Sequence, residues 1–339
     1  MWVFAVNDKS GGGRGKKVWA LVEAELQRRK LPYQAILART PEEACTEIRK
    51  QLANYKGSST DLAADVPATA NSNGSLGSPA VQPAVQAVIV IGGDGTIHSI
   101  LPALYESGVP LGIIPSGSGN DTARAFEIPS EPIEALNRIL SCESALPVDL
   151  IVLHSSAPGE PSTMRPVLTA LAVGFDAAIA AAVNRSAYKK LCNLLGAGSF
   201  AYVIGLFQML MSYRPRPIIV TVDGKAHEFE RGWMAAVCSV PAYGGGLRIC
   251  PDASPTDGLL DVCVIHTCTA LQMLRVFPTL LSGKHVHLPY VKMLRGKVVT
   301  VADQQRTGEE PIGIYGDGEP AGATPLYAEA AGNRISLLR

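Results

Sequence analysis

The sequence has no excess charge of either sign, with 30 lysines and arginines against 30 aspartates and glutamates. Binding to nucleic acid or anionic lipid through bulk attraction needs a surplus of positive charge, so no nucleic-acid partner is expected and any membrane contact must be local. The apolar content of 47% still permits substantial burial, and 339 residues exceed what one hydrophobic core usually covers. We therefore expect two domains.

Closely spaced cysteines are also missing. None of the seven cysteines forms a Cys-x-x-Cys pair, and their odd number argues against a complete set of intramolecular disulfides. We expect them to be reduced core residues. His285 and His287 lack an evident third ligand, which favours ordinary structural histidines over a metal site.

Long uncharged runs are scarce as well. Residues 196–213 reach about the lower limit for a spanning helix, but Gln208 and several glycines favour a buried or interfacial helix. Asp8 and Lys9 interrupt a very short apolar start, so no signal peptide is expected. The sequence predicts a cytoplasmic protein that visits a membrane without crossing it.

The most informative segment that is present is a glycine-rich turn after a run of β-branched residues. Residues 87–91 read as a buried parallel strand, which delivers Gly92-Gly93-Asp94-Gly95-Thr96 to the carboxyl edge of a sheet, where open α/β folds bind ligands. Glycines let the backbone approach an anion closely, and Thr96 is expected to cap a helix that starts near Ile97. A carboxylate beside phosphates is repelled unless a cation or a transferable proton lies between them, so Asp94 indicates catalysis.

Two further segments repeat this order of strand, glycine-rich loop and helix. Residues 109–114 read as a strand before Pro115-Ser116-Gly117-Ser118-Gly119-Asn120-Asp121, with a helix from about Thr122. Residues 3–6 read as a short strand before a third loop at residues 7–15. One such loop is as often a tight turn as a ligand site, but paired loops after consecutive strands can face one ligand.

The remaining chain divides into an insertion and a β-rich region. Residues 57–83 are rich in Gly, Ser, Thr, Ala, Asn and Pro without periodicity, which predicts a disordered surface insertion and favours neutral loop expansion over regulation. After about Leu146 the sequence predicts short strands, with a strong hairpin signal at Asp223-Gly224. These strands are expected at residues 148–153, 167–173, 217–222, 233–240, 259–265 and 297–301. The pattern predicts a sandwich-like second domain, with the site in the cleft between domains.

Six motifs, in order, resemble the diacylglycerol kinase catalytic-domain family, which includes bacterial lipid kinases and, more distantly, sphingosine and ceramide kinases. The match runs over nearly the whole chain, and the ordered set is far more specific than any single motif. The motifs are residues 7–15, residues 92–96, residues 115–121, Gly174-Phe175-Asp176, Asp257-Gly258-Leu259-Leu260-Asp261 and Asp317-Gly318-Glu319.

The resemblance implies a fold of two parts. The first is an α/β nucleotide-binding domain, Rossmann-like and phosphofructokinase-like, over residues 1–145, interrupted at residues 57–83. The second is a β-sandwich-like lipid-substrate domain over residues 146–339, whose C-terminal tail returns to the first domain.

The resemblance also implies an ATP-dependent lipid kinase that uses Mg²⁺ to phosphorylate a hydroxyl of diacylglycerol or a similar lipid, in phospholipid biosynthesis at the membrane surface. Related bacterial enzymes imply a homodimer. Phosphoryl transfer needs an immobilised triphosphate, Mg²⁺ to neutralise its oxygens and a base for the attacking hydroxyl. The implied nucleotide-binding residues are Thr40, Gly92, Gly93, Asp94, Gly95, Thr96, Ile97, His98, Ser118, Asn120 and Asp121. Thr40 is equally an ordinary helix N-cap.

The Asp317-Gly318-Glu319 element carries the expected catalytic base. Two carboxylates at a spacing of two face the same side of an extended segment, so one can take the proton of the lipid hydroxyl while the other helps to hold metal or nucleotide. The family places the base in this element, and the sequence does not separate Asp317 from Glu319. Asp94 is a third candidate, and a turn with two solvated acids is the simplest alternative.

A structural Mg²⁺ is implied in the second domain as well. By position, its ligands are the backbone carbonyls of Ser254 and Leu259 and the carboxylate of Asp257, a mixture of oxygens typical of hard cations. A glycine-centred turn without a metal is the alternative.

Other functions stay open. NAD kinases share the Gly-Gly-Asp-Gly-Thr loop, although residues 115–121 and the late Asp-Gly-Glu element fit the lipid-kinase order better. A non-catalytic lipid-sensing protein is disfavoured because Asp94, Asp317 and Glu319 are all present. The acceptor, whether diacylglycerol or a sphingoid base, is not identified, because apolar clefts distinguish poorly between hydrocarbon chains.

Overall fold

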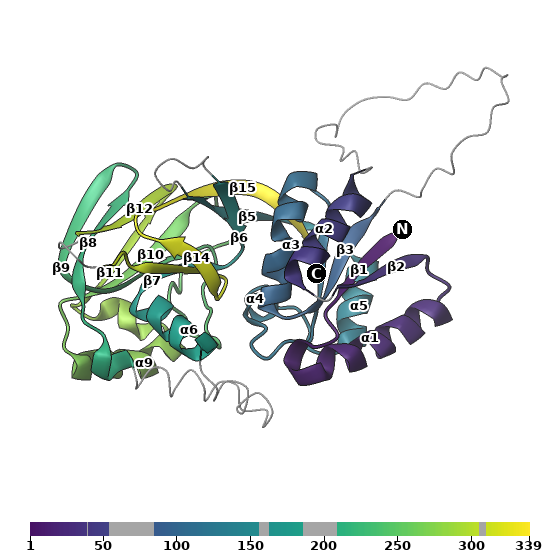
Figure 1. Ribbon diagram of the computed structural model, residues 1–339, viewed down its shortest axis with the longest axis horizontal. Coiled ribbons are helices and arrows are strands. Elements are labelled where there is room, and N and C mark those ends of the chain that lie inside the picture. The colour runs from purple at the N-terminus through teal and green to yellow at the C-terminus, as the bar shows by residue number, and fades with distance from the viewer. Residues whose placement is uncertain (39, 54–84, 156–162, 186–208, 305–309) are drawn as a thin grey trace, which may run out of the picture.

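The computed structural model describes residues 1–38, 40–53, 85–155, 163–185, 209–304 and 310–339. They form two lobes, an N-terminal one in purple and blue and a C-terminal one mostly in green and yellow (Figure 1). The predicted insertion at residues 57–83 lies outside the described residues, as does most of the apolar stretch 196–213. Among the described helices, none is long and apolar enough to span a bilayer.

The N-terminal lobe is a parallel sheet between two layers of helices. Its strands, in the order β2-β1-β3-β4, are β1 (Trp2–Val6), β2 (Tyr33–Leu37), β3 (Ala87–Gly92) and β4 (Leu111–Pro115). The helices are α1 (Ser10–Arg28), α2 (Pro41–Leu52), α3 (Asp94–Ser107), α4 (Asp121–Ala125) and α5 (Pro132–Ser141). All of β3 is buried, because helices cover both faces of the sheet.

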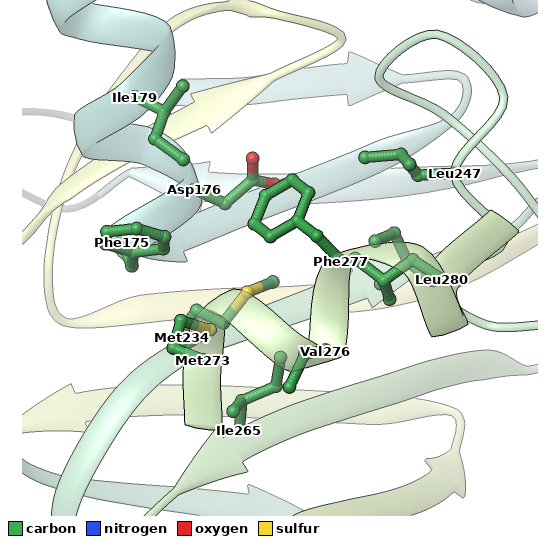
Figure 2. Close-up of a pocket in the computed structure, with 11 residues that line it drawn as sticks. Phe175, Asp176, Ile179, Met234, Leu247, Ile265, Met273, Val276, Phe277 and Leu280 are labelled. Carbon is green, nitrogen blue, oxygen red and sulfur yellow. The ribbon is translucent and has the colours of Figure 1, made fainter. Parts of the chain in front are cut away.

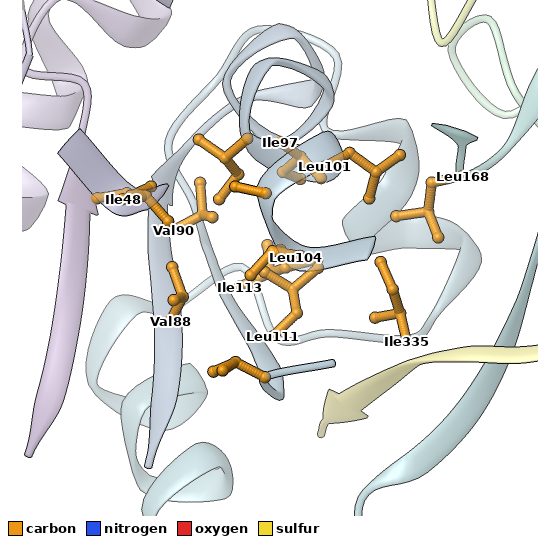
Figure 3. Close-up of a cluster of buried hydrophobic side chains, with 14 of the residues drawn as sticks. Ile48, Val88, Val90, Ile97, Leu101, Leu104, Leu111, Ile113, Leu168 and Ile335 are labelled. Atoms are coloured by element: carbon orange, nitrogen blue, oxygen red, sulfur yellow. The ribbon is translucent and has the colours of Figure 1, made fainter. Parts of the chain in front are cut away.

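Two apolar cores hold these layers together. On one face, α1 and α5 pack against Phe4 and Ile89. On the other, Ile48 of α2 and Leu101 of α3 pack against the strands, and burying each such side chain contributes about 1.5–3 kcal/mol (Figure 3). Leu168, from the C-terminal lobe, lies in this same core, so the lobes share buried surface.

The C-terminal lobe is mainly antiparallel, with a core between its strands and a second one beneath its helices. Its strands are β5 (Leu146–Ser155), β6 (Thr163–Val167), β7 (Ala170–Gly174), β8 (Arg216–Val222), β9 (Lys225–Cys238), β10 (Leu260–His266), β11 (Val291–Gly296), β12 (Val298–Asp303), β13 (Gly313–Gly316), β14 (Glu319–Ala323) and β15 (Leu326–Leu338). Its helical segments are α6 (Phe175–Arg185), α9 (Ala270–Ser282) and the short 3-10 helix η1 (Lys284–His287).

Strand β15 belongs to both lobes. Its first half pairs with β12, and β5 pairs along most of its length. Its end then joins the parallel sheet of the N-terminal lobe, with Leu337 opposite Leu111 of β4. Figure 1 shows this strand running from one lobe to the other.

The prediction of one continuous strand over residues 167–173 is wrong. The chain forms two strands there, β6 and β7, which are separated by Leu168 and Thr169. The backbone N–H groups of these two residues donate to the carboxylate of Asp317 instead of a neighbouring strand. The predicted hairpin at Asp223-Gly224 is confirmed, with positive φ at both residues between β8 and β9.

The residues singled out for metal or disulfide chemistry have ordinary surroundings. Six cysteines lie in the described part of the chain and are unpaired there. His285 is buried in η1 and donates from Nε2 to the Ile249 carbonyl at 2.9 Å. Among the described residues, no three His, Cys, Asp or Glu side chains gather as a metal site would require.

Candidate active site

The three glycine-rich loops predicted from the sequence meet at the carboxyl edge of the parallel sheet. The hydroxyls of Ser10 and Ser116 share a buried hydrogen bond of 2.5 Å, which joins the N-terminal loop to the loop after β4. Asn7 donates from Nδ2 to Thr96 Oγ1 at 3.0 Å, which joins the N-terminal loop to the loop after β3. The three loops are therefore gathered at one place, and loops of this kind supply the backbone N–H groups that a phosphate site requires.

The N-terminal loop is formed by three glycines in left-handed conformation. Gly11, Gly12 and Gly13 have φ of 56°, 69° and 94°, so the first turn of α1 is not helical. Backbone turns of this kind gather N–H groups that bind anions. A side chain at Gly11 would collide with the carbonyl oxygen of Ser116, so the close approach of these two loops requires glycine.

Asp94 connects the loop after β3 with the loop after β4. Its carboxylate accepts the backbone N–H of Asp121 at 3.1 Å and of Thr122 at 2.8 Å, and it thereby caps α4. These two N–H groups offset part of the negative charge of the Asp94 carboxylate, which would otherwise repel a bound phosphate. The prediction that Thr96 caps a helix near Ile97 is wrong, because α3 already begins at Asp94.

A glycine-rich loop of the C-terminal lobe, residues 244–246, contacts Asp121 at the end of the loop after β4. The N–H of Gly245 donates to Asp121 at 2.9 Å, and Arg124 Nη1 donates to the same carboxylate at 2.5 Å. Burial raises the pKa of Asp121, and the nearby Asp94 raises it further. This contact was not predicted from the sequence, although the run Gly244-Gly245-Gly246 is a visible signal of a glycine-rich loop.

The Asp317-Gly318 pair forms the turn between β13 and β14, with φ of 51° and 83°. The predicted extended segment, with both carboxylates on one side, is therefore wrong. Asp317 is 4% exposed and accepts hydrogen bonds from Leu168 N (3.0 Å), Thr169 N (2.8 Å), Thr169 Oγ1 (2.7 Å) and His98 Nδ1 (3.0 Å). Burial alone would raise the pKa of Asp317, but the His98 and Thr169 bonds outweigh it and hold that pKa below its usual range.

Glu319 has different surroundings. It begins β14, is exposed, and accepts no hydrogen bond or ion pair from any described residue. Its Oε1 lies 2.9 Å from the point where a Cβ atom of Gly95 would be. The glycine at 95 therefore gives this carboxylate room beside the loop after β3.

Three of the predicted nucleotide-binding side chains have other partners. Thr40 accepts the Glu43 N–H at 3.2 Å and caps α2, as the simpler alternative holds. Ile97 is 3% exposed in the hydrophobic core, and His98 binds Asp317. Ser118 is exposed on the loop after β4, and the nucleotide contacts themselves stay predictions.

The predicted structural metal site already contains a positive charge. Arg295 forms a short ion pair with Asp257, the one side-chain ligand of the predicted set, and its Nε lies 3.5 Å from Asp261 Oδ2. Asp257 Oδ1 also accepts the Leu259 N–H at 3.0 Å. A cation would have to displace the guanidinium, so these residues do not fit a metal as they stand.

An apolar cavity of about 30 Å³ lies in the C-terminal lobe between α6 and α9 (Figure 2). That is room for one or two water-sized groups. Asp176 is the one carboxylate among its described lining residues, and its oxygen accepts the Tyr243 hydroxyl at 2.5 Å. Burial raises the pKa of Asp176, which favours the neutral acid in this apolar setting.

Comparisons with known proteins cover both lobes. Residues 1–152 match the diacylglycerol kinase catalytic domain, and residues 169–339 match the YegS C-terminal NAD kinase beta sandwich-like domain. The chain is 32% identical to a diacylglycerol kinase of Mycobacterium tuberculosis over 289 residues, which cover 85% of this chain and 88% of that protein. It is 23% identical to the putative lipid kinase YtlR of Bacillus subtilis over 328 residues, which cover 96% of this chain and 95% of that protein.

The fold has solved counterparts. The structure of a putative diacylglycerol kinase from Bacillus anthracis matches 100% of this chain and 96% of its own, with a TM-score of 0.72 and 19% sequence identity. The predicted fold, an α/β domain followed by a β-sandwich-like domain, is confirmed. The chain belongs to the diacylglycerol kinase catalytic-domain family, a family of lipid kinases.

Proposed function

We propose that this protein transfers the γ-phosphoryl group of ATP to a hydroxyl of diacylglycerol or a similar lipid. Family membership supports the reaction class. The observation that carries the proposal is the position of Glu319, an exposed carboxylate beside Gly95 in the glycine loop after β3. A proton acceptor next to a phosphate-binding loop is what transfer to a hydroxyl requires.

In the proposed reaction, the three glycine-rich loops hold the triphosphate through backbone N–H groups. Glu319 accepts the proton of the lipid hydroxyl while that oxygen forms its bond to the γ-phosphorus. The bond from the γ-phosphorus to its bridging oxygen breaks, and ADP leaves with the electron pair. Glu319 then releases its proton to solvent.

Mg²⁺ would neutralise the phosphate oxygens during this transfer. Asp94 and Asp121 are the carboxylates that would hold it together with the nucleotide phosphates. As they stand both are already paired, Asp121 with Arg124 and the Gly245 N–H, and Asp94 with two backbone N–H groups, so a cation would have to replace some of these donors. Burial raises the pKa of Asp121 and repulsion from Asp94 raises it further, and the positive charge of a bound cation would offset both effects.

We place the contact with the lipid surface on α9. Leu271 and Leu281 are 60% and 65% exposed there, and both lie on the outward side of a helix whose Met273, Val276 and Leu280 are buried. Exposed leucines on the outer surface of a helix favour contact with a membrane surface. The homodimer stays a prediction from the resemblance, and the cytoplasmic location stays a prediction from the sequence.

Radiolabelled ATP offered with a panel of acceptors tests the proposal. We expect label in a phosphorylated lipid when diacylglycerol, monoacylglycerol, sphingosine or ceramide is presented in mixed micelles. Labelled NADP from NAD would support the NAD kinase alternative instead. No labelled product from any acceptor, with a folded protein that binds ATP, would overturn the enzymatic proposal.

A further inference from the structure

His98 joins the two lobes at the candidate active site. It lies on α3, one turn after the start of the helix, and its Nδ1 is 3.0 Å from Asp317 Oδ2 in the β13–β14 turn. The imidazole is 23% exposed, and the Asp317 side chain is 4% exposed. The mechanism above does not use this pair.

The hairpin touches α3 at two points that are one helical turn apart. Asp317 binds His98, and Glu319 lies over Gly95, three residues earlier on the same helix. Side chains three residues apart lie on one face of a helix. The hairpin therefore lies along one face of α3, and the His98 bond is close to the position of Glu319 above the glycine loop.

The other bonds to Asp317 come from the β6–β7 connection. Leu168 and Thr169 donate to the carboxylate, and the Leu168 side chain is buried in the core beneath α3. These bonds hold the turn to the β6–β7 connection and do not involve the imidazole. Among the described residues, His98 is the one that holds the turn to α3 directly through a side-chain hydrogen bond.

The electrostatics favour this bond. Burial lowers the pKa of His98, but the hydrogen bond and the charges of Asp317 and Glu319 outweigh burial and the nearby Arg165, so its pKa is raised overall. A charged donor to an ionised carboxylate forms a stronger hydrogen bond than a neutral pair.

We propose that His98 is a positioning residue that ties the Glu319 hairpin to α3 and so sets the distance from the base to the phosphate-binding loops. The inference rests on the proposed function for its kinetic effect. It concerns the geometry of the hairpin, which is measurable without turnover. Misplacement of a catalytic group by a fraction of an ångström to 1 Å lowers the rate of transfer strongly.

The test compares His98→Phe, which keeps a ring of similar size without a donor, with His98→Asn, which keeps a donor near the position of Nδ1. We expect His98→Phe to lower kcat for lipid phosphorylation about tenfold or more, with the KM for ATP changed less than about threefold. His98→Asn should recover most of the loss. Hydrogen exchange of residues 313–323 should be faster in His98→Phe than in the wild type and near normal in His98→Asn.

A matched histidine serves as the control. His154 is also 23% exposed, and its Nε2 lies 3.1 Å from Glu329 in the C-terminal lobe, where β5 meets β15. His154→Phe should leave kcat within about twofold of the wild type. If His98→Phe does not fold, His98→Ala takes its place in the same measurements.

The outcomes separate the two proposals. Unchanged kcat and unchanged exchange in the His98 variant would overturn the positioning role. A loss of kcat that His98→Asn does not recover would also contradict it. If the wild type phosphorylates no lipid, the proposed function fails, while the exchange of residues 313–323 still decides whether His98 holds the hairpin.

Discussion

Asp317 and Glu319 belong to one hairpin but have opposite surroundings. Asp317 is buried under four hydrogen bonds, whereas Glu319 is exposed and none of the described residues binds its carboxylate. A carboxylate whose pKa is held below its usual range accepts protons poorly. In our account Asp317 therefore maintains the shape of the turn, and Glu319 is the base.

The His98–Asp317 pair makes stability depend on pH. Because the pKa of His98 is raised in the folded protein, its stabilising effect is fully present below the unfolded value of 6.5 and is lost as pH rises through the folded value. The groups that face His98 are Asp317, Glu319 and Arg165. We expect the Tm difference between wild type and His98→Asn to be larger at about pH 6 than at about pH 9. Thermal melts of both proteins between these pH values measure this Tm difference. A Tm difference that does not change with pH would count against a charged His98.

Among the elements, the turn at residues 254–259 gives the sharpest choice between two explanations. Arg295 pairs with Asp257 and lies near Asp261, so a side chain supplies the charge that a metal would. We expect the Tm of the wild type without nucleotide to be unchanged by Mg²⁺. Arg295→Met should lower stability by about 1–3 kcal/mol, because the Asp257 pair is partly exposed but the nearby Asp261 is buried, and should make the Tm rise with added Mg²⁺.

Thermal melts with EDTA and with Mg²⁺ measure this difference. Lys292→Met is a suitable control, because Lys292 is exposed on the same strand β11. A wild-type Tm that rises with Mg²⁺, and an Asp257→Asn variant that no longer responds, would support the structural metal and contradict the role of Arg295.

Local patterns in the sequence predicted the glycine loops and the strands before them well. Residues 87–91 are an uninterrupted apolar run, and such a run identifies a buried strand without knowledge of its partners. The break at Leu168 and Thr169 and the His98–Asp317 bond were not predictable in this way. Both depend on contacts between residues about 150 and 219 positions apart, and no local pattern reports such contacts.

At the scale of the whole molecule, β15 ties the lobes into one folding unit. Leu337 is 1% exposed and pairs with β4 of the N-terminal lobe, although it lies near the end of the chain. We expect Leu337→Ala to destabilise the protein by about 2–5 kcal/mol, through lost burial and a cavity in the shared core. Leu37→Ala, at a position 57% exposed, should change stability by less than about 0.5 kcal/mol.

Chemical denaturation of both variants checks this prediction. A small effect of Leu337→Ala, or separate unfolding transitions of two lobes in the wild type, would show that the lobes are stable independently. The division into an α/β and a β-rich lobe followed from strand and helix patterns, whereas the pairing of β15 with β4 is a long-range parallel contact that those patterns do not contain.

Single-turnover phosphoryl transfer distinguishes Glu319 as the catalytic base from Asp317 as a structural residue. Glu319→Gln keeps the shape of the side chain and removes the proton acceptor, so we expect the transfer rate to fall about a hundredfold or more, with ATP affinity and Tm nearly unchanged. Asp317→Asn should lower Tm together with the rate, because it weakens the bonds that hold the turn. Near-normal transfer by Glu319→Gln would contradict the account, and a large loss of rate in Asp317→Asn with unchanged Tm would assign the base to Asp317 instead.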